Sequence, residues 1–263
     1  MLNLKENIVL ITGASSGIGR ACAQLFAQQG AKLILCARRQ ERLETIAKAL
    51  YDLHHTHCLP LVLDVRNQSE VENTLNNLPL EWQSIDILIN NAGLALSSDP
   101  IQQGSFTNWD IMIDTNIKGL LYVTRHLLPG MLARKRGHII NIGSIAGRDC
   151  YPNGNVYCAT KHAVKALSKA MRLDLMGSPI RVTEIAPGAV ETEFSEVRWN
   201  DKDKAKAFYQ DFDPLLAEDI ADAAYYCATR PLHVDIAEIL IMPTAQAAGN
   251  AIYRGGKKKT QTQ

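Results

Sequence analysis

The sequence predicts an α/β fold: a single domain in which helices cover both faces of a doubly wound, seven-stranded parallel sheet. Two observations predict it. Short runs rich in Val, Ile and Leu alternate with longer segments of helical periodicity, and each run is nearly continuous in apolar residues, as in strands buried on both faces of a parallel sheet. The alternation also continues without a linker rich in Pro, Gly or Ser, so we expect residues 1–263 to form one domain.

Seven apolar runs have the strand pattern, and the longer segments between them have the 3.6-residue period of helices that pack on a sheet. The expected strands are NIVLIT (7–12), KLILCA (32–37), LPLVLD (59–64), IDILIN (85–90), GHIINIG (137–143), IRVTEIA (180–186) and AEILIM (237–242). The expected helices are residues 18–29, 39–51, 67–78, 106–134 and 155–176. Two segments break this rhythm: residues 189–213, charged and aromatic, are a candidate substrate loop, and the basic residues 254–263 are predicted to be a disordered tail.

The composition argues against several function classes. Of the 263 residues, 46% are hydrophobic and 21% charged, and the net charge of +1 gives no field of one sign to attract nucleic acid or an anionic membrane. No apolar secretory region precedes the first strand, and the apolar segment 119–132 is too short to span a bilayer and is broken by Arg125, His126 and Pro129. Six scattered cysteines without a C-x-x-C motif predict reduced thiols in a cytoplasmic protein.

The stretch TGASSGIG closes the first strand and opens the first helix. Gly13 permits the tight turn, Gly17 lets the backbone approach a pyrophosphate, and Gly19 lets the helix pack close to the sheet. Backbone N–H groups and the helix dipole favour phosphate at this position, and Ser15 and Ser16 can cap the helix or bind phosphate oxygens. The turn therefore predicts a dinucleotide site, with a plain strand–helix turn as the alternative.

The second strand ends in CARRQER, at the position where a cofactor with a free ribose 2′-hydroxyl usually meets a carboxylate. Arg38 and Arg39 stand there instead, and two guanidinium groups suit the 2′-phosphate of NADP. The alternative for Arg39 is a solvated arginine at a helix start. Asp64, at the end of the third strand, is placed to bind adenine or to cap the following helix. The predicted cofactor is NADP.

The stretch YCATK places Tyr157 and Lys161 four residues apart, on one face of a helix. A phenol has a pKa of about 10 and is a poor base at neutral pH, but a nearby ammonium group and an oxidised nicotinamide would stabilise the phenolate. We therefore expect Lys161 to lower the pKa of Tyr157, so that the tyrosine exchanges a proton with an alcohol or carbonyl while hydride moves. By itself the spacing is a weak signal, and an exposed pair on a helix turn is its default interpretation.

Further polar motifs fall at the carboxyl ends of the expected strands or on adjoining helices, where ligands bind in sheets of this kind. INIGS ends a strand at Ser144, TNIKG places Asn116 in a long helix, NNAG ends at Gly93, and APG is followed by Thr192. Taken singly, Ser144 is also explained as a strand-end cap and Asn116 as a helix kink.

The combined pattern T-G-x-x-x-G-x-G, N-N-A-G, N, S, Y-x-x-x-K and P-G-x-x-x-T, over residues 7 to about 245, resembles the short-chain dehydrogenase/reductase family. The resemblance implies a Rossmann fold in which Ser144 holds the substrate oxygen, Tyr157 is the general acid/base and Lys161 assists it. It also implies that Asn116 supports a proton-relay water. The implied cofactor contacts are Thr12, Gly13, Ser15, Ser16, Gly17, Ile18, Gly19, Arg38, Arg39, Asp64, Val65, Asn91, Ala92, Gly93, Tyr157, Lys161, Pro187, Gly188, Val190 and Thr192.

Within the family, NNAGLAL, MIDTNIKGLLYVTRHLLPGM, GHIINIGS, GNVYCATK, TEFSEVR and MPTAQ are similar to bacterial NADP-dependent 3-hydroxy acid dehydrogenases. This resemblance implies a homotetramer that oxidises L-serine, L-allo-threonine and related acids at the β-carbon and reduces malonic semialdehyde to 3-hydroxypropionate. Such a substrate needs a carboxylate partner, and Arg198 is the candidate because arginine can bind a carboxylate with two parallel hydrogen bonds. An exposed pair with Glu196 or Asp201 is the alternative. Cys158 and His162 depart from the similar proteins, which have Gly and Ala.

Other functions stay open at this point: a reductase of another carbonyl, such as a 3-oxoacyl thioester or a ketone, or an NADP-binding sensor without catalysis. The complete set of serine, asparagine, tyrosine and lysine favours an enzyme whose partner is a small-molecule substrate. We expect no metal site, because HHTHC (54–58) is better explained as a solvated loop.

Overall fold

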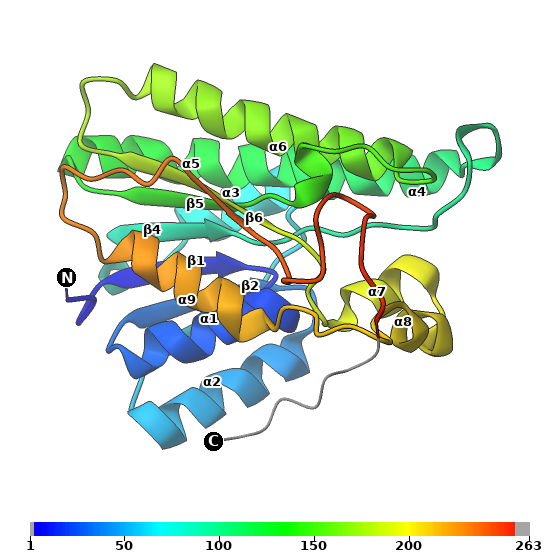
Figure 1. Cartoon of the computed structure of the whole chain (residues 1–263). Helices are drawn as coiled ribbons and strands as arrows, with labels where there is room; N and C mark the ends of the chain where they lie inside the picture. Colours follow the sequence, from blue (N-terminus) through cyan, green and yellow to red (C-terminus); the bar gives the residue numbers. More distant parts are fainter. Residues whose placement is uncertain (1–2, 256–263) are drawn as a thin grey trace.

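The computed structural model describes residues 3–255 and contains one sheet of seven parallel strands in the order β3-β2-β1-β4-β5-β6-β7 (Figure 1). The strands are β1 Ile8–Thr12, β2 Lys32–Ala37, β3 Cys58–Val62, β4 Ile85–Asn90, β5 His138–Ile142, β6 Arg181–Pro187 and β7 Glu238–Ile241. The predicted α/β fold with a seven-stranded parallel sheet is confirmed. Because the strand order reverses between β1 and β4, a crevice opens at their carboxyl ends, where such sheets bind ligands.

Helices cover both faces of the sheet. They are α1 Gly17–Gln28, α2 Gln40–His54, α3 Gln68–Asn76, α4 Phe106–Ile113, α5 Leu120–Arg134, α6 Asn155–Asp174, α7 Glu193–Trp199, α8 Lys202–Phe208 and α9 Ala217–Ala228. Figure 1 shows α1, α2 and α9 on one face and α3, α5 and α6 on the other, with α7 and α8 beside the carboxyl ends of the strands. Among residues 3–255, no helix combines the length and apolarity needed to cross a membrane.

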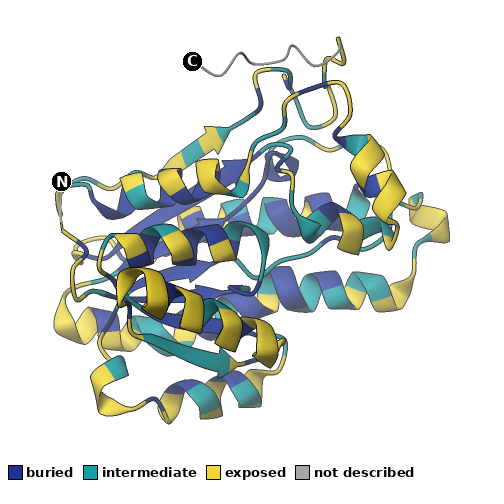
Figure 2. Cartoon of the chain, turned by 90° about the horizontal axis from the view of Figure 1, so that it is seen from below, coloured by how far each residue is buried: buried dark blue, intermediate teal, exposed yellow. Residues whose placement is uncertain are grey.

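The central strands are apolar throughout because both of their faces are covered. Every residue of β1 and β5 is buried, and Figure 2 shows this buried sheet between the half-exposed helices. Side chains alternate between the two layers: Val9 and Ile11 pack with α1 and α9, whereas Ile8 and Leu10 pack with α3 and α5. This rigid centre holds the strand ends from which the site is built.

The two edge strands correct the expectation that every strand is buried on both faces. Val62 of β3 is 48% exposed and Leu240 of β7 is 44% exposed. The residues of β3 are half-buried up to an exposed end, and those of β7 alternate between exposed and half-buried. An edge strand has one neighbour instead of two, and here the helical layers do not extend fully over it. The apolar run alone does not distinguish an edge from a centre.

Two predicted segments also differ in detail. The expected helix 106–134 is divided by a π-helix, Asp114–Gly119, that separates α4 from α5. The candidate loop 189–213 contains the two short helices α7 and α8. The predicted tail 254–263 lies outside the described residues from position 256 onward, and its first residue, Arg254, donates hydrogen bonds to the carbonyls of Phe208 and Gln210.

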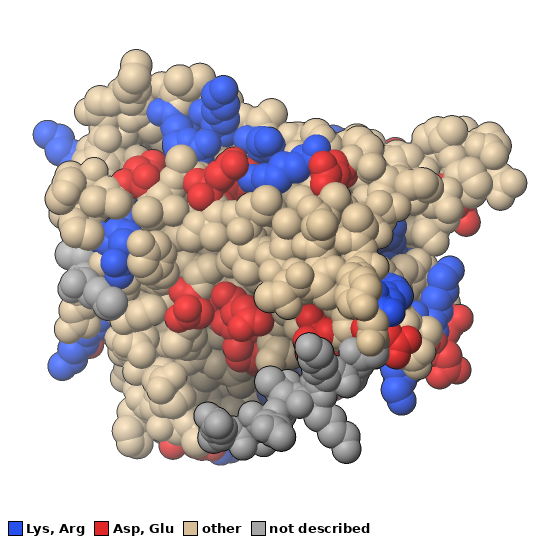
Figure 3. Space-filling model, viewed as in Figure 1, with Lys and Arg blue, Asp and Glu red and all other residues tan. Residues whose placement is uncertain are grey.

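On the face shown in Figure 3, basic and acidic side chains are interspersed and do not gather into one patch of a single sign. This agrees with the near-zero net charge of the chain.

Candidate active site

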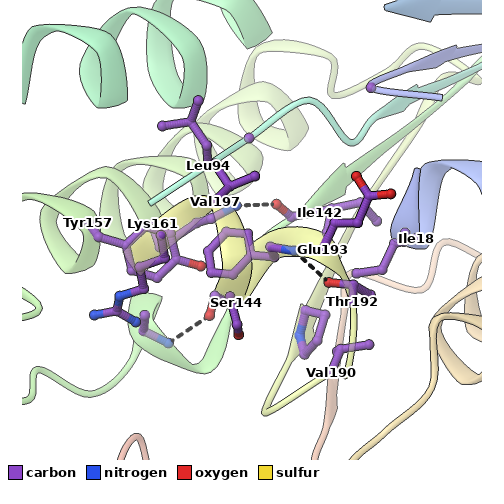
Figure 4. Close-up of a pocket in the computed structure, with 18 of the residues that line it drawn as sticks. Ile18, Leu94, Ile142, Ser144, Tyr157, Lys161, Val190, Thr192, Glu193 and Val197 are labelled. Carbon is purple, nitrogen blue, oxygen red and sulfur yellow. Dashed lines mark hydrogen bonds between the residues drawn. The ribbon is translucent and has the colours of Figure 1, made fainter. Parts of the chain in front are cut away.

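A cavity of about 640 Å³ opens at the carboxyl ends of the strands (Figure 4). Its wall brings together the glycine turn, the ends of β2, β4 and β6, the residues after β5, the first turns of α6, and helix α7. All but three of the predicted site residues line it. Thr12, Gly19 and Asn116 are buried behind the wall and support it from within.

The glycine turn leaves no room for side chains where β1 passes into α1. Gly13 and Gly17 have φ angles of +67° and +50°, which an L-residue rarely adopts. A Cβ on Gly19 would lie 2.5 Å from both the Asn91 Nδ2 and the Gly13 carbonyl oxygen. Thr12 fixes the turn to β4, because its hydroxyl accepts hydrogen bonds from the backbone N–H groups of Asn91 and Ala92, both at 3.0 Å. The backbone is therefore open for a pyrophosphate, as the dinucleotide hypothesis requires.

The two serines of the turn have other partners than expected. Ser16 occupies the N-cap position of α1, but its side chain makes no capping hydrogen bond. Instead the Arg39 guanidinium donates to the hydroxyls of Ser15 and Ser16, each at 2.9 Å, and to Glu193 of α7 at 3.2 Å. Arg39 is the N-cap residue of α2, yet its side chain lies against the cavity wall and is not simply solvated. Arg38 is exposed and lines the same wall.

Asp64 and Val65 line the cavity after β3. The Asp64 carboxylate accepts hydrogen bonds from the Arg66 side chain, at 3.0 Å from Nε, and from its backbone N–H. This contact with Arg66 lowers the pKa of Asp64. Asp64 does not cap helix α3; Asn67 does, through its side chain and the backbone N–H of Glu70.

The candidate catalytic pair, Tyr157 and Lys161, lies buried on the cavity side of α6 (Figure 4). The ammonium Nζ donates to the Ile142 carbonyl at 2.9 Å and lies 6.0 Å from the Tyr157 ring centroid. Burial lowers the pKa of Lys161 to about 8, and the charge of Glu184 opposes this shift. The exposed-turn alternative is therefore wrong for these two residues.

The expected lowering of the tyrosine pKa is not found in the protein alone. Burial raises the pKa of Tyr157 above its ordinary value, and hydrogen bonding with Ser144 and the charge of Arg198 only partly oppose the rise. Desolvation penalises the phenolate, and the ammonium is directed to the Ile142 carbonyl instead of the phenol oxygen. Bound NADP⁺ would add the positive nicotinamide that the expectation also included.

Ser144 and Asn116 have structural partners as well as a place in the site. Ser144 begins a 3-10 turn, Ile145–Gly147, and its hydroxyl oxygen accepts from the Ala146 N–H at 3.1 Å. Asn116 lies in the π-helix, where its amide exchanges two 2.8 Å hydrogen bonds with the Leu94 backbone and donates to Thr160 at 3.0 Å. Both alternatives, the cap and the irregular helix, are thus present beside the candidate roles.

The end of β6 leads into α7. Pro187, Gly188 and Val190 line the cavity, and Thr192 caps α7 by accepting from the Phe194 N–H at 3.2 Å. Thr192 also packs on the glycine turn, since a Cβ on Gly17 would lie 3.3 Å from its Cβ. The N-terminus of helix α7 therefore lies beside the glycine turn.

Arg198, near the end of α7, reaches into the same cavity. Its guanidinium donates to the Tyr151 hydroxyl at 3.3 Å and lies 5.7 Å from the Tyr157 ring centroid. Its Nε is buried and has no hydrogen-bond partner among residues 3–255. The alternative pair with Glu196 or Asp201 is not formed.

Several polar cavity residues were not found from the sequence, among them Tyr151, Glu193 and Gln246. Tyr151 comes from the turn before α6, Glu193 from α7, and Gln246 from the segment after β7. Gln246 is buried and accepts from the Ala189 N–H at 2.8 Å, which fixes the strand end next to Gly188. The stretches TEFSEVR and MPTAQ contain two of them, but nothing in their letters shows which side chains face the cavity.

Comparison with known proteins gives one consistent result. The short chain dehydrogenase family model matches residues 7–203. The NADP-dependent 3-hydroxy acid dehydrogenase YdfG of Escherichia coli K12 is 48% identical over 250 residues, 94% of this chain and 99% of that protein. Sulfoacetaldehyde reductase 2 of Chromohalobacter salexigens is 45% identical over 92% of this chain and 96% of that protein. The closed form of serine dehydrogenase complexed with NADP⁺ superimposes with a TM-score of 0.88 at 48% identity, covering 92% of this chain and 97% of that chain.

These likenesses take in the whole cavity, from the glycine turn to helix α7. The space left by the glycines of the turn fits a dinucleotide; the 3-hydroxy acid dehydrogenase relative is NADP-dependent, and the serine dehydrogenase structure is complexed with NADP⁺. The chain is an NADP-dependent oxidoreductase that acts on hydroxyl groups, and it belongs to the short-chain dehydrogenase family.

Proposed function

We propose that this oxidoreductase transfers hydride between NADP(H) and the β-carbon of small 3-hydroxy acids. The proposed substrates are L-serine, L-allo-threonine and 3-hydroxypropionate, with malonic semialdehyde in the direction of reduction. The observation that carries the proposal is Arg198: a buried, unpaired Nε donor on a guanidinium that faces the Tyr157 ring at 5.7 Å. A carboxylate that pairs with this arginine would bring the β-carbon, two bonds from the carboxyl carbon, within reach of the phenol.

The side chains of the chain handle the proton and the oxygen, and bound NADP supplies the hydride acceptor or donor. Ser144 would donate its hydroxyl proton to the substrate oxygen while Tyr157 transfers the reaction proton. The raised pKa keeps Tyr157 protonated at neutral pH, which is the form that donates to a carbonyl oxygen in reduction. For oxidation the phenolate must be stabilised, and Arg198 and Lys161 are the cations near its ring.

The remaining proposed roles concern binding and proton exit. The glycine turn would hold the pyrophosphate, Arg38 and Arg39 the 2′-phosphate, and Asp64 the adenine. Asn116 and Lys161 flank Gly93, since a Cβ there would lie 3.3 Å from the Asn116 Oδ1 and 3.5 Å from the Lys161 Nζ. We place the proton-relay water at this point, between the lysine and the asparagine.

The experiment is NADPH formation from NADP⁺ with each of the three acids, repeated with NAD⁺ and with Arg198→Ala. We expect turnover of at least one acid with NADP⁺ and a KM for that acid raised about tenfold or more in Arg198→Ala, because a hydrogen bond to a charged group contributes about 1.5–3 kcal/mol. Lys204→Ala is the matched control, because Lys204 also lines the cavity but lies over Trp199 at 5.5 Å. An unchanged KM in Arg198→Ala would show that the carboxylate is not bound there.

A sulfonate substrate is the second candidate, and the same arginine favours it. A guanidinium donates to a sulfonate as it does to a carboxylate, and a relative that is 45% identical is a sulfoacetaldehyde reductase. Sulfoacetaldehyde with NADPH therefore belongs in the substrate panel, beside malonic semialdehyde and an uncharged ketone. Turnover of the ketone alone would replace the acid by another carbonyl.

We also propose that the enzyme works as a homotetramer in the cytoplasm. The likeness to 3-hydroxy acid dehydrogenases supports the tetramer, and six cysteines that are all free thiols support a reducing compartment. Light scattering on the purified protein tests the tetramer: a mass near 29.0 kDa would be that of a monomer and would contradict it.

A further inference from the structure

One carboxylate is buried next to the site without a role in binding or proton transfer. Glu184 of β6 is 1% exposed and is the only acidic residue among the buried residues of the described range 3–255. In the sheet it stands between Asn141 of β5 and Glu238 of β7. Two carboxylates directly opposite each other repel, and a buried charge requires a partner, so this position needs a cation.

Arg148 supplies that cation from the segment after β5. Its Nη1 and Nη2 bind Oε1 and Oε2 of Glu184, each at 3.1 Å, and Nη2 also lies 3.0 Å from the Glu238 carboxylate. Nη1 donates further to the Ser144 carbonyl at 3.4 Å. The Arg148 side chain is 11% exposed. One guanidinium therefore joins β6 and β7 to the backbone of the residue that carries the candidate catalytic hydroxyl.

The turn that contains Ser144 is also held by close packing on both sides. Before it, a Cβ on Gly143 would lie 2.2 Å from the Glu184 Oε1. After it, a Cβ on Gly147 would lie 2.6 Å from the Lys161 carbonyl oxygen. The turn is thus confined between the Glu184 carboxylate and the backbone of helix α6, and the Glu184 charge also faces the Lys161 ammonium.

We infer that Arg148 and Glu184, with Glu238 as the outer arm, form a clamp of positioning residues that holds the Ser144 hydroxyl in the geometry needed to bind the substrate oxygen. The inference deepens the proposed function, because it rests on the role proposed for Ser144. Neither Arg148 nor Glu184 lines the cavity. Loss of the clamp is therefore expected to reduce turnover while leaving cofactor binding unchanged.

The test compares Arg148→Met/Glu184→Met with Glu238→Gln and Arg148→Lys. The double variant replaces a buried ion pair by apolar side chains of similar size and leaves no unpaired buried charge. Arg148→Lys keeps both the positive charge and the Glu184 carboxylate, but a lysine lacks the fork that reaches acceptors on three residues at once. Glu238→Gln is the matched control, because its side chain is 46% exposed and the bonds to Glu184 and Ser144 remain.

The readouts are kcat and KM with the substrate that the wild type turns over fastest, the NADPH Kd, and the Tm. We expect kcat to fall at least tenfold in the double variant and severalfold in Arg148→Lys, with the NADPH Kd within twofold of wild type and Glu238→Gln unaffected. A kcat within twofold of wild type, or an NADPH affinity that falls in step with kcat, would overturn the clamp. If the double variant does not fold, Arg148→Lys decides by the same criteria.

The two proposals fail separately. A wild type that reduces a ketone but no 3-hydroxy acid or semialdehyde would contradict the proposed substrates, yet the comparison of kcat with NADPH affinity would still test the clamp with that ketone. Conversely, full kcat in the clamp variants with L-serine would overturn the clamp and leave the substrate assignment intact.

Discussion

Arg39 and Glu193 give the sharpest prediction about cofactor choice. The pair connects α2 to α7 across the cavity wall, with 3.2 Å between Nη1 and the carboxylate, and 44% and 43% of the two side chains exposed. Arg42 donates to both oxygens of the same carboxylate, at 2.8 and 2.9 Å. If Arg39 binds the 2′-phosphate of NADP, the phosphate and Glu193 share one guanidinium. Glu193 then competes with the cofactor.

The magnitudes follow from the exposure of the pair. A hydrogen bond between arginine and a phosphate contributes about 1.5–3 kcal/mol, whereas an exposed ion pair such as Arg39–Glu193 contributes about 0–1 kcal/mol. The net contribution of Arg39 to NADPH binding is then about 1–2 kcal/mol. Arg39→Ala should raise the NADPH Kd roughly five- to thirtyfold, and Glu193→Gln should lower it by up to about fivefold.

The assay is titration of NADPH and NADH by nucleotide fluorescence. The two cofactors differ only in the 2′-phosphate, so the ratio of their Kd values isolates the contact. Arg42→Ala is the matched control, since Arg42 binds Glu193 without lining the cavity, and its NADPH Kd should stay within about twofold of wild type. The reasoning is refuted if Arg39→Ala weakens NADH as much as NADPH, or if Glu193→Gln weakens NADPH.

Three further predictions concern the catalytic pair and the glycine turn. Tyr157→Phe should lower kcat at least a hundredfold with an NADPH Kd close to wild type; retained turnover would exclude the phenol as acid/base. Lys161 has a pKa of about 8 in the folded protein and 10.5 in the unfolded chain. Between these pH values the unfolded state binds more protons, so the contribution of Lys161 to stability rises with pH. Urea unfolding of wild type and Lys161→Met at pH 7 and 9.5 measures this. The free energy of unfolding of the wild type, relative to that of the variant, should be higher at pH 9.5 than at pH 7. Gly19→Ala, whose Cβ would lie 2.5 Å from Asn91, should lower the free energy of unfolding by about 1–3 kcal/mol. In the control Gly130→Ala, the new Cβ would lie 3.2 Å from the end of the Arg134 side chain, and the free energy of unfolding should change by less than about 1 kcal/mol.

The sheet could be predicted closely from the sequence because its central strands are covered on both faces. The runs NIVLIT and IDILIN match β1 and β4 to within one residue at each end. The same rule failed at β3 and β7, where equally apolar runs are the sheet edges and leave Val62 and Leu240 partly exposed. A run of apolar residues predicts that a strand forms. Whether that strand is central or at an edge depends on the topology of the whole sheet.

The site could be predicted where a motif fixes the backbone, and not where distant elements meet. The positive φ of Gly13 and the crowding at Gly19 follow from the turn itself. The contact between Arg39 and Glu193 joins residues 154 positions apart, and the clamp joins the segment after β5 to β6 and β7. The π-helix at Asn116 could not be predicted from the helical periodicity either, because the residues before and after it continue one helical pattern.

The pKa values of the catalytic pair show what sequence spacing leaves out. Four residues on a helix place Tyr157 and Lys161 on one face, but burial then drives both toward their neutral forms, raising one pKa and lowering the other. The charges that oppose this come from elsewhere: Glu184 of β6 favours the ammonium, and Arg198 of α7 favours the phenolate. If Tyr157 transfers the proton and Arg198 binds the substrate, as we propose, the transfer depends on a buried strand carboxylate and on helix α7, and substrate binding is linked to activation of the phenol.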